Sequence, residues 1–289
     1  MIDSKQADNA QVGSTIDAST VRVDLLGSVS VVADGIRTEL RAGKIRSMLA
    51  TLALDAGRIV YYDELVQELW PGESLKNPRN ALQAHATRIR RTFERSTPQT
   101  DQCCALRAVY NGYILDIPHE LVDSNRFLDL TARGAIALSH DPAEAARLLR
   151  QGLDLWRGPA LLNTHTGERC RGAAAFLEER RLLAWEDLTS AHLLLGDNRQ
   201  AATELRRLVA THPTRERLCA LLMLALYRTD RQSDALRLFH CTRKHLDEEL
   251  GVEPGKALLR LYEDILTQHP ALDCPEVVLK GSQFGIARH

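Results

Sequence analysis

The stretch NPRNALQAHATRIRRTF, residues 77–93, carries four arginines in a chain of 289 residues whose formal net charge is only −1. Asn77 is a suitable helix N-cap, because its side-chain oxygen can accept a hydrogen bond from a free amide of the first turn. Pro78 suits the first helical position, where no amide donor is needed. One narrow apolar stripe follows at helical spacing, made of Leu82, Ala86, Ile89 and Phe93. The stretch therefore predicts an amphipathic helix that lies on a small core.

The opposite side of this helix is polar and basic. Residues 77–95 carry five arginines against one glutamate, whereas the wider segment 21–118 carries 13 basic against 11 acidic side chains. A local patch of this kind can bind a polyanion without an extreme isoelectric point. For the helix taken alone, a solvated charged face is the alternative.

The neighbouring segments favour polyanion binding over a merely solvated charged face. Residues 44–57 and 61–70 predict two further helices, the first ending at Gly57 and the second capped by Asp63. Residues 106–117, LRAVYNGYILDI, predict a β-hairpin whose two-residue turn is Asn111-Gly112. Residues 21–40 predict short strands. Strands, three helices and a hairpin together predict a winged helix-turn-helix with an added N-terminal sheet.

In such a module the last helix enters the major groove of duplex DNA. Short polar and arginine side chains on its exposed face reach base edges, and arginines at its margins release counterions from the phosphates. For base edges or nearby phosphates we expect Asn80, Gln83, Thr87, Arg88 and Arg91. For the DNA backbone we expect Arg79, Arg90, Lys44 and Arg46. The hairpin candidates are Tyr110, Asn111 and Tyr113, and packing is the alternative role for both tyrosines.

The second half of the chain has a period of 34 residues. The positions typical of a tetratricopeptide helix pair are occupied by Trp185, Leu188, Gly196, Ala201, Leu205 and Pro213, and Ala235 and Phe239 follow Ala201 and Leu205 by one period. An earlier unit centres on Ala145 and Leu149, separated from the next by one period plus an insertion. Repeats of this kind form a concave surface for another protein chain. An irregular helical bundle with accidental spacing is the alternative.

Length and composition, with 44% hydrophobic residues, indicate about two domains. We expect an N-terminal tail at residues 1–20, a DNA-binding domain at 21–118, a helical domain at 119–268 and a C-terminal tail at 269–289. No apolar run is long enough to span a membrane, and the polar first 20 residues lack the apolar segment of a signal peptide. We therefore expect a cytoplasmic, nucleoid-associated protein with no membrane contact.

Catalytic and metal chemistry are not expected. The six cysteines form no CxxC pair and, with the histidines, no zinc-ligand spacing, so buried reduced thiols are predicted and no metal or cofactor. The possible nucleophiles Ser139 and Cys170 lack the surrounding motif of a nucleophile elbow or triad. The sequence thus favours a binding protein over an enzyme.

Several motifs resemble one family, the Streptomyces antibiotic regulatory proteins. LDLWRGPAL (153–161), LMLALYRTDRQSDALRLF (222–239) and EELGVEPG (248–255) resemble its bacterial transcriptional activation domain. DELVQELWPG (63–72) and RNALQAHATRIRR (79–91) resemble its OmpR-type DNA-binding half. The resemblance runs from about residue 21 to 268. It implies a mainly α fold with a small β portion, an OmpR-like winged helix-turn-helix followed by an all-α, tetratricopeptide-like repeat domain.

The resemblance also implies a function. Members are pathway-specific activators that bind tandem direct repeats near the −35 region of promoters in antibiotic gene clusters. The expected partners are therefore double-stranded promoter DNA, a second protomer on that DNA, and RNA polymerase with its sigma factor. The sequence contains no GxxxxGK[ST] phosphate-binding loop, and residues 1–20 leave no room for a receiver domain, which indicates the short form of the family. A tetratricopeptide-like adaptor that does not bind DNA is the alternative.

Overall fold

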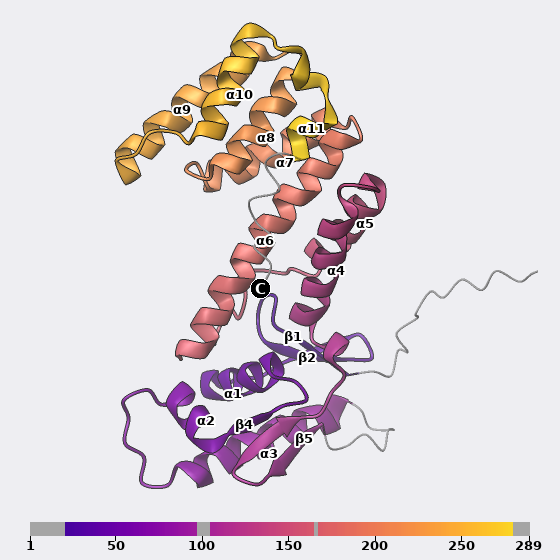
Figure 1. The fold of residues 1–289 in the computed structure, drawn as a ribbon. Coiled ribbons are helices and arrows are strands. Elements are labelled where there is room, and N and C mark those ends of the chain that lie inside the picture. Colours follow the sequence, from indigo (N-terminus) through magenta and orange to yellow (C-terminus); the bar gives the residue numbers. More distant parts are fainter. Residues whose placement is uncertain (1–20, 97–104, 165–166, 280–289) are drawn as a thin grey trace, which may run out of the picture. The chain divides into compact units, whose positions relative to one another are not determined.

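The computed structural model describes residues 21–96, 105–164 and 167–279 (Figure 1). The predicted N-terminal tail, residues 1–20, lies outside these ranges. The chain divides into two compact units, the first built mainly from residues 29–122 and the second mainly from residues 123–162 and those after 168. The predicted fold class is confirmed, because small sheets and three helices in the first unit precede an all-helical second unit.

The first unit holds two three-stranded antiparallel sheets around three helices. One sheet has the order β1-β2-β3 and the other the order β4-β6-β5. The elements are β1 Arg22–Asp24, β2 Ser30–Ala33, β3 Ile36–Glu39, α1 Gly43–Leu54, β4 Ile59–Tyr61, α2 Tyr62–Leu69, α3 Pro78–Ser96, β5 Leu106–Val109, β6 Gly112–Leu115 and the 3-10 turn η1 His119–Leu121. The arrangement is the predicted winged helix-turn-helix with its N-terminal sheet.

The turn of the β5–β6 hairpin differs from the prediction by one residue. Val109 pairs with Gly112, so the two turn residues are Tyr110 and Asn111, and Asn111 has a φ of 57°. Gly112 begins β6 and pairs with Tyr61 of β4. A Cβ at Gly112 would lie 2.5 Å from the carbonyl oxygen of Val60. Glycine is therefore required by the close approach of β4, a strand of three residues that the sequence analysis did not predict.

The start of α2 also differs from the prediction. The N-cap is Tyr61, and Asp63 lies inside the first turn. The Glu64 carboxylate accepts a hydrogen bond from the Tyr61 amide at 2.9 Å. Asp63 is wrong as the cap because pairing between β4 and β6 continues to Tyr61, and the helix begins directly where the strand ends.

The second unit is a stack of helices. Its elements are α4 Asp123–Ala137, α5 Pro142–Leu153, α6 Glu168–Leu194, α7 Asn198–Thr211, α8 Glu216–Tyr227, α9 Gln232–Leu250, α10 Lys256–Thr267, the 3-10 turn η2 Pro270–Asp273 and α11 Pro275–Leu279. Part of the segment predicted as a C-terminal tail is thus helical. Leu272 and Val278 are fully buried in the apolar core of this unit, and residues 280–289 lie outside the described ranges.

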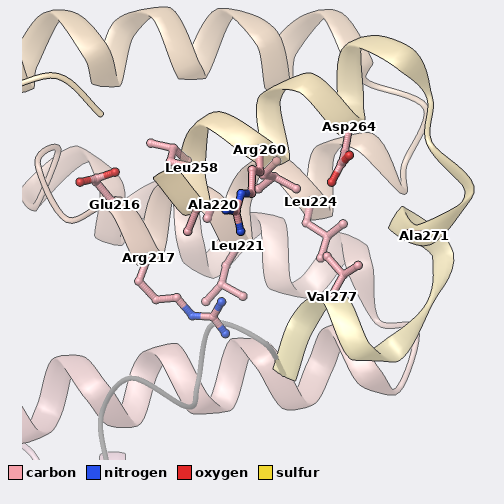
Figure 2. Close-up of a pocket in the computed structure, with 12 residues that line it drawn as sticks. Glu216, Arg217, Ala220, Leu221, Leu224, Leu258, Arg260, Asp264, Ala271 and Val277 are labelled. Carbon is pink, nitrogen blue, oxygen red and sulfur yellow. The ribbon is translucent and has the colours of Figure 1, made fainter. Parts of the chain in front are cut away.

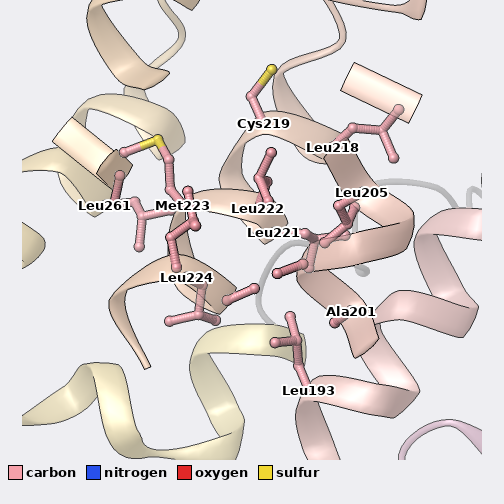
Figure 3. Packing of buried hydrophobic residues seen from close by; sticks show 14 of the residues in the cluster. Leu193, Ala201, Leu205, Leu218, Cys219, Leu221, Leu222, Met223, Leu224 and Leu261 are labelled. Atoms are coloured by element: carbon pink, nitrogen blue, oxygen red, sulfur yellow. The ribbon is translucent and has the colours of Figure 1, made fainter. Parts of the chain in front are cut away.

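The 34-residue period corresponds to helix pairs that pack alike. α7 and α9 begin one period apart, at Asn198 and Gln232. Ala201 and Leu205 of α7 are fully buried (Figure 3). Ala235 of α9 is fully buried as well. The earlier unit follows the same rule, because Ala145 and Leu149 of α5 are also fully buried. Small residues at the first position let the paired helices approach, and large ones a turn later fill the space between them.

Trp185 lies at the margin of the apolar core, and two of the cysteines are less buried than the sequence indicated. Trp185 is partly buried, with the guanidinium carbons of Arg150 and Arg207 lying 5.4 and 5.3 Å from its ring centroid. Cys170 and Cys219 are buried thiols as predicted, whereas Cys241 and Cys274 are exposed. The prediction was wrong for the latter two because each lies on the outer side of its segment.

We expect Gly112→Ala to destabilise the first unit by about 1–3 kcal/mol, because the new methyl group would overlap the β4 backbone. Gly172→Ala is the matched control. Gly172 lies in α6, and a methyl group added to it would meet no atom within 4 Å apart from the adjacent backbone of its own helix, so alanine there should stabilise its helix by about 0.5–1 kcal/mol. Urea unfolding followed by far-ultraviolet circular dichroism measures both. Equal stability of Gly112→Ala and the unsubstituted chain would contradict the close approach of β4.

Candidate nucleic-acid interface

One face of α3 is held in the core. The apolar stripe that the sequence predicts is buried along its whole length, with Leu82, Ala86 and Ile89 fully inaccessible and Phe93 4% exposed. The predicted cap is also confirmed, since the Asn80 amide donates to the Asn77 side-chain oxygen at 3.2 Å. Both features fix the rotation of α3 about its axis.

The other face of α3 is exposed to solvent. The side chains exposed on it are Asn80, Gln83, Ala84, Thr87, Arg88, Arg91 and the acidic Glu94. The Thr87 hydroxyl donates to the Gln83 carbonyl at 2.9 Å, which leaves its acceptor lone pairs outward. Within the described part of the chain, Arg88 and Arg91 form no hydrogen bond or ion pair through their guanidinium groups. This face therefore presents amide, hydroxyl and guanidinium groups together, the groups that match base edges in a major groove.

Two arginines connect α3 to the β5–β6 hairpin. Near the start of the helix, Arg79 Nη2 donates to Asn111 Oδ1 at 3.3 Å, at the turn of the hairpin. Toward the other end, Arg90 Nε donates to the carbonyl oxygen of Leu106 at 2.9 Å, at the first residue of β5. The hairpin therefore runs alongside α3. Arg79 and Arg90, predicted for the DNA backbone, each have a bond that positions the hairpin.

A pair of tyrosines lies beneath these arginines. The Tyr62 and Tyr113 rings pack edge to face with centroids 5.4 Å apart, and Arg79 and Arg90 lie 5.6 and 6.0 Å from the respective ring centroids. Tyr113 is 4% exposed, and burial raises the pKa of its hydroxyl. Tyr113 therefore has the alternative role, which is packing. Tyr110 differs, because it is 95% exposed at the hairpin turn.

The two basic residues of α1 lie in different surroundings. The Lys44 ammonium pairs with Glu73 at 3.2 Å and lies 5.0 Å from the Trp70 ring centroid. Arg46 donates to three backbone carbonyl oxygens, those of Leu40 at 2.6 Å, Arg41 at 3.0 Å and Asn163 at 2.8 Å. Because these bonds occupy both Nε and Nη1, Arg46 holds loops of its own unit, a role that the sequence did not indicate.

A histidine of α3 was missed by the sequence analysis. His85 stacks on Trp70 with ring centroids 5.6 Å apart and an interplanar angle of 13°. Its ring nitrogens are buried and have no hydrogen-bond partner among the described residues. Burial, followed by the nearby Arg88 and Lys44 charges, lowers its pKa. Its position offered a signal, because His85 lies three residues after Leu82 and four before Ile89, at the edge of the buried stripe.

The described residues contain no group of three or more histidine, cysteine or acidic side chains suited to hold a metal ion. Among the helices of the described segments, none combines the length and apolarity that a membrane span requires. The exposed face of α3, with the hairpin that Arg79 and Arg90 bond to it, is the candidate site.

Comparisons with known proteins match both units. The family described as "Transcriptional regulatory protein, C terminal" matches residues 39–113, and the family described as "Bacterial transcriptional activator domain" matches residues 122–266. Transcriptional regulator RedD of Streptomyces coelicolor is 50% identical over 89% of this chain and 74% of its own length. Regulatory protein DnrI of Streptomyces peucetius is 35% identical over 88% of this chain and 94% of its own. The solved structure of Mycobacterium tuberculosis EmbR in complex with a low affinity phosphopeptide superposes with a TM-score of 0.84 at 30% identity, covering 91% of this chain and 69% of that one.

The stacked, desolvated His85 should titrate below the value of about 6.5 expected for an exposed imidazole. The unfolded chain then takes up a proton that the folded chain does not, so the stability contributed by neutral His85 is present above about pH 6.5 and is lost as the pH falls below it. Proton NMR titration of the His85 ring measures the pKa, and His85→Phe, which keeps an aromatic ring on Trp70, identifies the resonance. A midpoint at or above the exposed value would contradict the stacked, neutral ring.

Proposed function

The chain belongs to the Streptomyces antibiotic regulatory protein family, and from this premise we propose that it activates transcription by binding direct repeats near the −35 region of its promoters. As a member it is a transcriptional regulator with a DNA-binding domain, and it is not an enzyme. RedD and DnrI, named as regulators, come from Streptomyces species. This supports a pathway-specific role in an antibiotic or other secondary-metabolite gene cluster.

The exposed face of α3 carries the proposal. We propose that it enters the major groove, with Asn80, Gln83 and Thr87 toward base edges and Arg88 and Arg91 toward bases or adjacent phosphates. Support comes from exposure of all five side chains and from the absence of intramolecular bonds to the two guanidinium groups within the described segments. A guanidinium that forms no ion pair needs to break none when it meets a phosphate.

The roles proposed for the remaining candidate DNA-contacting residues follow from their surroundings. We propose that exposed Arg79 and the half-buried Arg90 and Lys44 face phosphates. The two arginines do so while bonded to the hairpin, and Lys44 while paired with Glu73. Tyr110 and Asn111 are proposed to contact the minor groove or its phosphates from the turn. We leave out Tyr113 because it is buried, and we assign Arg46 to positioning because of its three carbonyl bonds.

The helical second unit is proposed to contact RNA polymerase through its sigma factor and to stabilise a second protomer on the adjacent repeat. The match of residues 122–266 to a transcriptional activator domain supports this. The alternative, a protein-interaction adaptor without DNA contact, is disfavoured by the match of residues 39–113 to a regulatory DNA-binding domain. Gel shift at two salt concentrations separates the two, because phosphate contacts make DNA affinity fall as salt rises.

We expect Arg88→Ala and Arg91→Ala each to cost roughly 1–3 kcal/mol in binding to promoter DNA if the contact is to a base, with relaxed preference at one position. If the contact is to phosphate, all sequences weaken alike and the salt slope falls by about one. Fluorescence anisotropy at several salt concentrations measures both quantities. Arg22→Ala is the control, since Arg22 is an exposed arginine of β1 that is paired with Asp24. Wild-type affinity in both α3 variants would exclude α3 as the DNA-binding element.

We expect a fragment ending at Val122 to shift promoter DNA more weakly than the full chain and to fail to activate transcription. The reason is that DNA contacts belong to the first unit, whereas polymerase and protomer contacts belong to the second. Gel shift and reconstituted transcription test the two parts. Activation by the fragment at the level of the full chain would overturn the role of the second unit.

The spacing of the repeats gives an independent test. Protomers that approach one face of the duplex require repeats about one helical turn, 10–10.5 bp, apart. Inserting half a turn should abolish cooperative binding by the full chain and leave binding to a single repeat unchanged. Cooperative binding that survives the insertion would contradict contact between protomers on adjacent repeats.

A further inference from the structure

The second unit contains a pocket of about 470 Å³ between α8 and α10, closed at one side by the segment that follows α10 (Figure 2). Pockets of about 300–1,000 Å³ are the size that proteins use for drug-sized ligands. The helices run the same way along it, since the Gly255 amide at the start of α10 donates to Glu216 at the start of α8, at 2.7 Å. One end of the pocket therefore holds both helix starts, and the other holds Asp264 and Ala271.

The walls of this pocket are mainly aliphatic. Eight of its twelve lining side chains are alanine, leucine or valine. Leu221 and Leu224 of α8 face it from one side and Leu258 of α10 from the other, and Val277 of α11 contributes the third wall. Leu261 of α10 also lines the pocket. Each of the four leucines is less than 10% exposed, so the wall is part of the packed core. Such a surface favours an apolar ligand body.

Charged groups are distributed unevenly along the pocket. Arg217 lies at the end with the helix starts, Arg260 lies in α10 between the ends, and Asp264 lies one turn further. Glu216 is engaged by the Gly255 amide, which reduces its effect on a ligand. The Arg217 side chain is fixed in place, because Nη2 donates to the Val278 carbonyl oxygen at 2.7 Å and to Ser190 Oγ at 3.4 Å.

Desolvation strengthens the attraction of Arg217 for an anion. Burial lowers the pKa of its guanidinium, in spite of the Glu186 and Asp187 carboxylates nearby. Charge interactions are stronger where water is excluded than at an exposed surface. Guanidinium groups also match carboxylate and sulfonate oxygens geometrically, through pairs of N–H donors.

We propose that this pocket binds a small amphipathic anion, whose apolar body lies between α8 and α10 and whose acid group faces Arg217 and Arg260. Asp264 excludes the acid group from the opposite end and so sets the orientation. The ligand would touch α8, α10 and the C-terminal segment at once. It would therefore stabilise the attachment of α11 to the rest of the unit, independently of DNA.

Two fluorescent probes that differ by one acid group test the proposal on the full chain. They are 8-anilinonaphthalene-1-sulfonate, which is anionic, and N-phenyl-1-naphthylamine, which is neutral and has the same rings. We expect saturable binding of both, with one site per chain. Ala257→Trp places an indole at an exposed position of the pocket wall and should weaken both probes by about tenfold or more, because it fills the space that a ligand body needs. Lys256→Trp, at the exposed neighbouring position outside the pocket, should bind both as the unsubstituted chain does.

Variants that remove one positive charge separate a site that recognises an anion from a site that is merely apolar. Arg260 is exposed, so Arg260→Gln should weaken the sulfonate probe by about two- to fivefold and leave the neutral probe unchanged. Arg206→Gln, an exposed arginine of α7 outside the pocket, should change neither. Circular dichroism melting confirms that each variant is folded. Should Ala257→Trp unfold the chain, the arginine pair still decides the question.

Two results would overturn the proposal. Undiminished binding of both probes to folded Ala257→Trp would show that they bind elsewhere. An equal effect of Arg260→Gln on the two probes would show that the site does not recognise the acid group. Neither result would bear on DNA binding by α3, which the anisotropy measurements test separately.

Discussion

Burial of one apolar stripe on α3 is the constraint on which the candidate site depends. With 3.6 residues per turn, a helix that directs Leu82, Ala86, Ile89 and Phe93 into the core must direct Asn80, Gln83, Thr87 and Arg91 outward. The cap formed by Asn77 fixes where the helix begins, so register and rotation are both set. No side chain on the exposed face is needed to hold the helix in place. The residue types on that face can therefore be those that bind a ligand.

The arginines of α3 have divided roles because of their surroundings. Arg79 and Arg90 lie over the Tyr62–Tyr113 pair and bond to the hairpin at its turn and at its first residue. Arg88 and Arg91 point to solvent. The first pair keeps the hairpin at a fixed distance from the helix, and the second pair remains for a ligand. A rigid support beneath an exposed recognition surface lowers the entropy lost on binding.

The second unit follows a different principle, in which each helix pair is packed by small and large residues one turn apart. Ala201 with Leu205 and Ala235 with Phe239 repeat this pattern, and all four are at most 3% exposed. The pattern ends at α10, where the chain turns back through η2 and α11 instead of adding another long pair. The pocket lies at this end of the repeats, where, among the described residues, the segment after α10 covers α8 and α10.

The sequence by itself determined the features that depend on local periodicity and capping. These are the start and buried face of α3 and the 34-residue period of the second unit. Patterns of this kind are local because a residue and its nearest turn neighbours decide them. The two strands of the β5–β6 hairpin were also predicted from local sequence, but the turn between them was placed one residue too late.

Only the tertiary structure decided which polar residues are engaged. Arg46 bonds to the carbonyl oxygen of Asn163, 117 positions away, and Arg90 bonds to that of Leu106, 16 positions away. Tyr113 is buried because Tyr62 and Arg90 pack on it, and Gly112 is required because β4 passes beside it. No periodicity of the sequence encodes such contacts. They arise when segments that are distant along the chain are brought together by burial of their apolar faces, and the same event leaves Arg88 and Arg91 exposed.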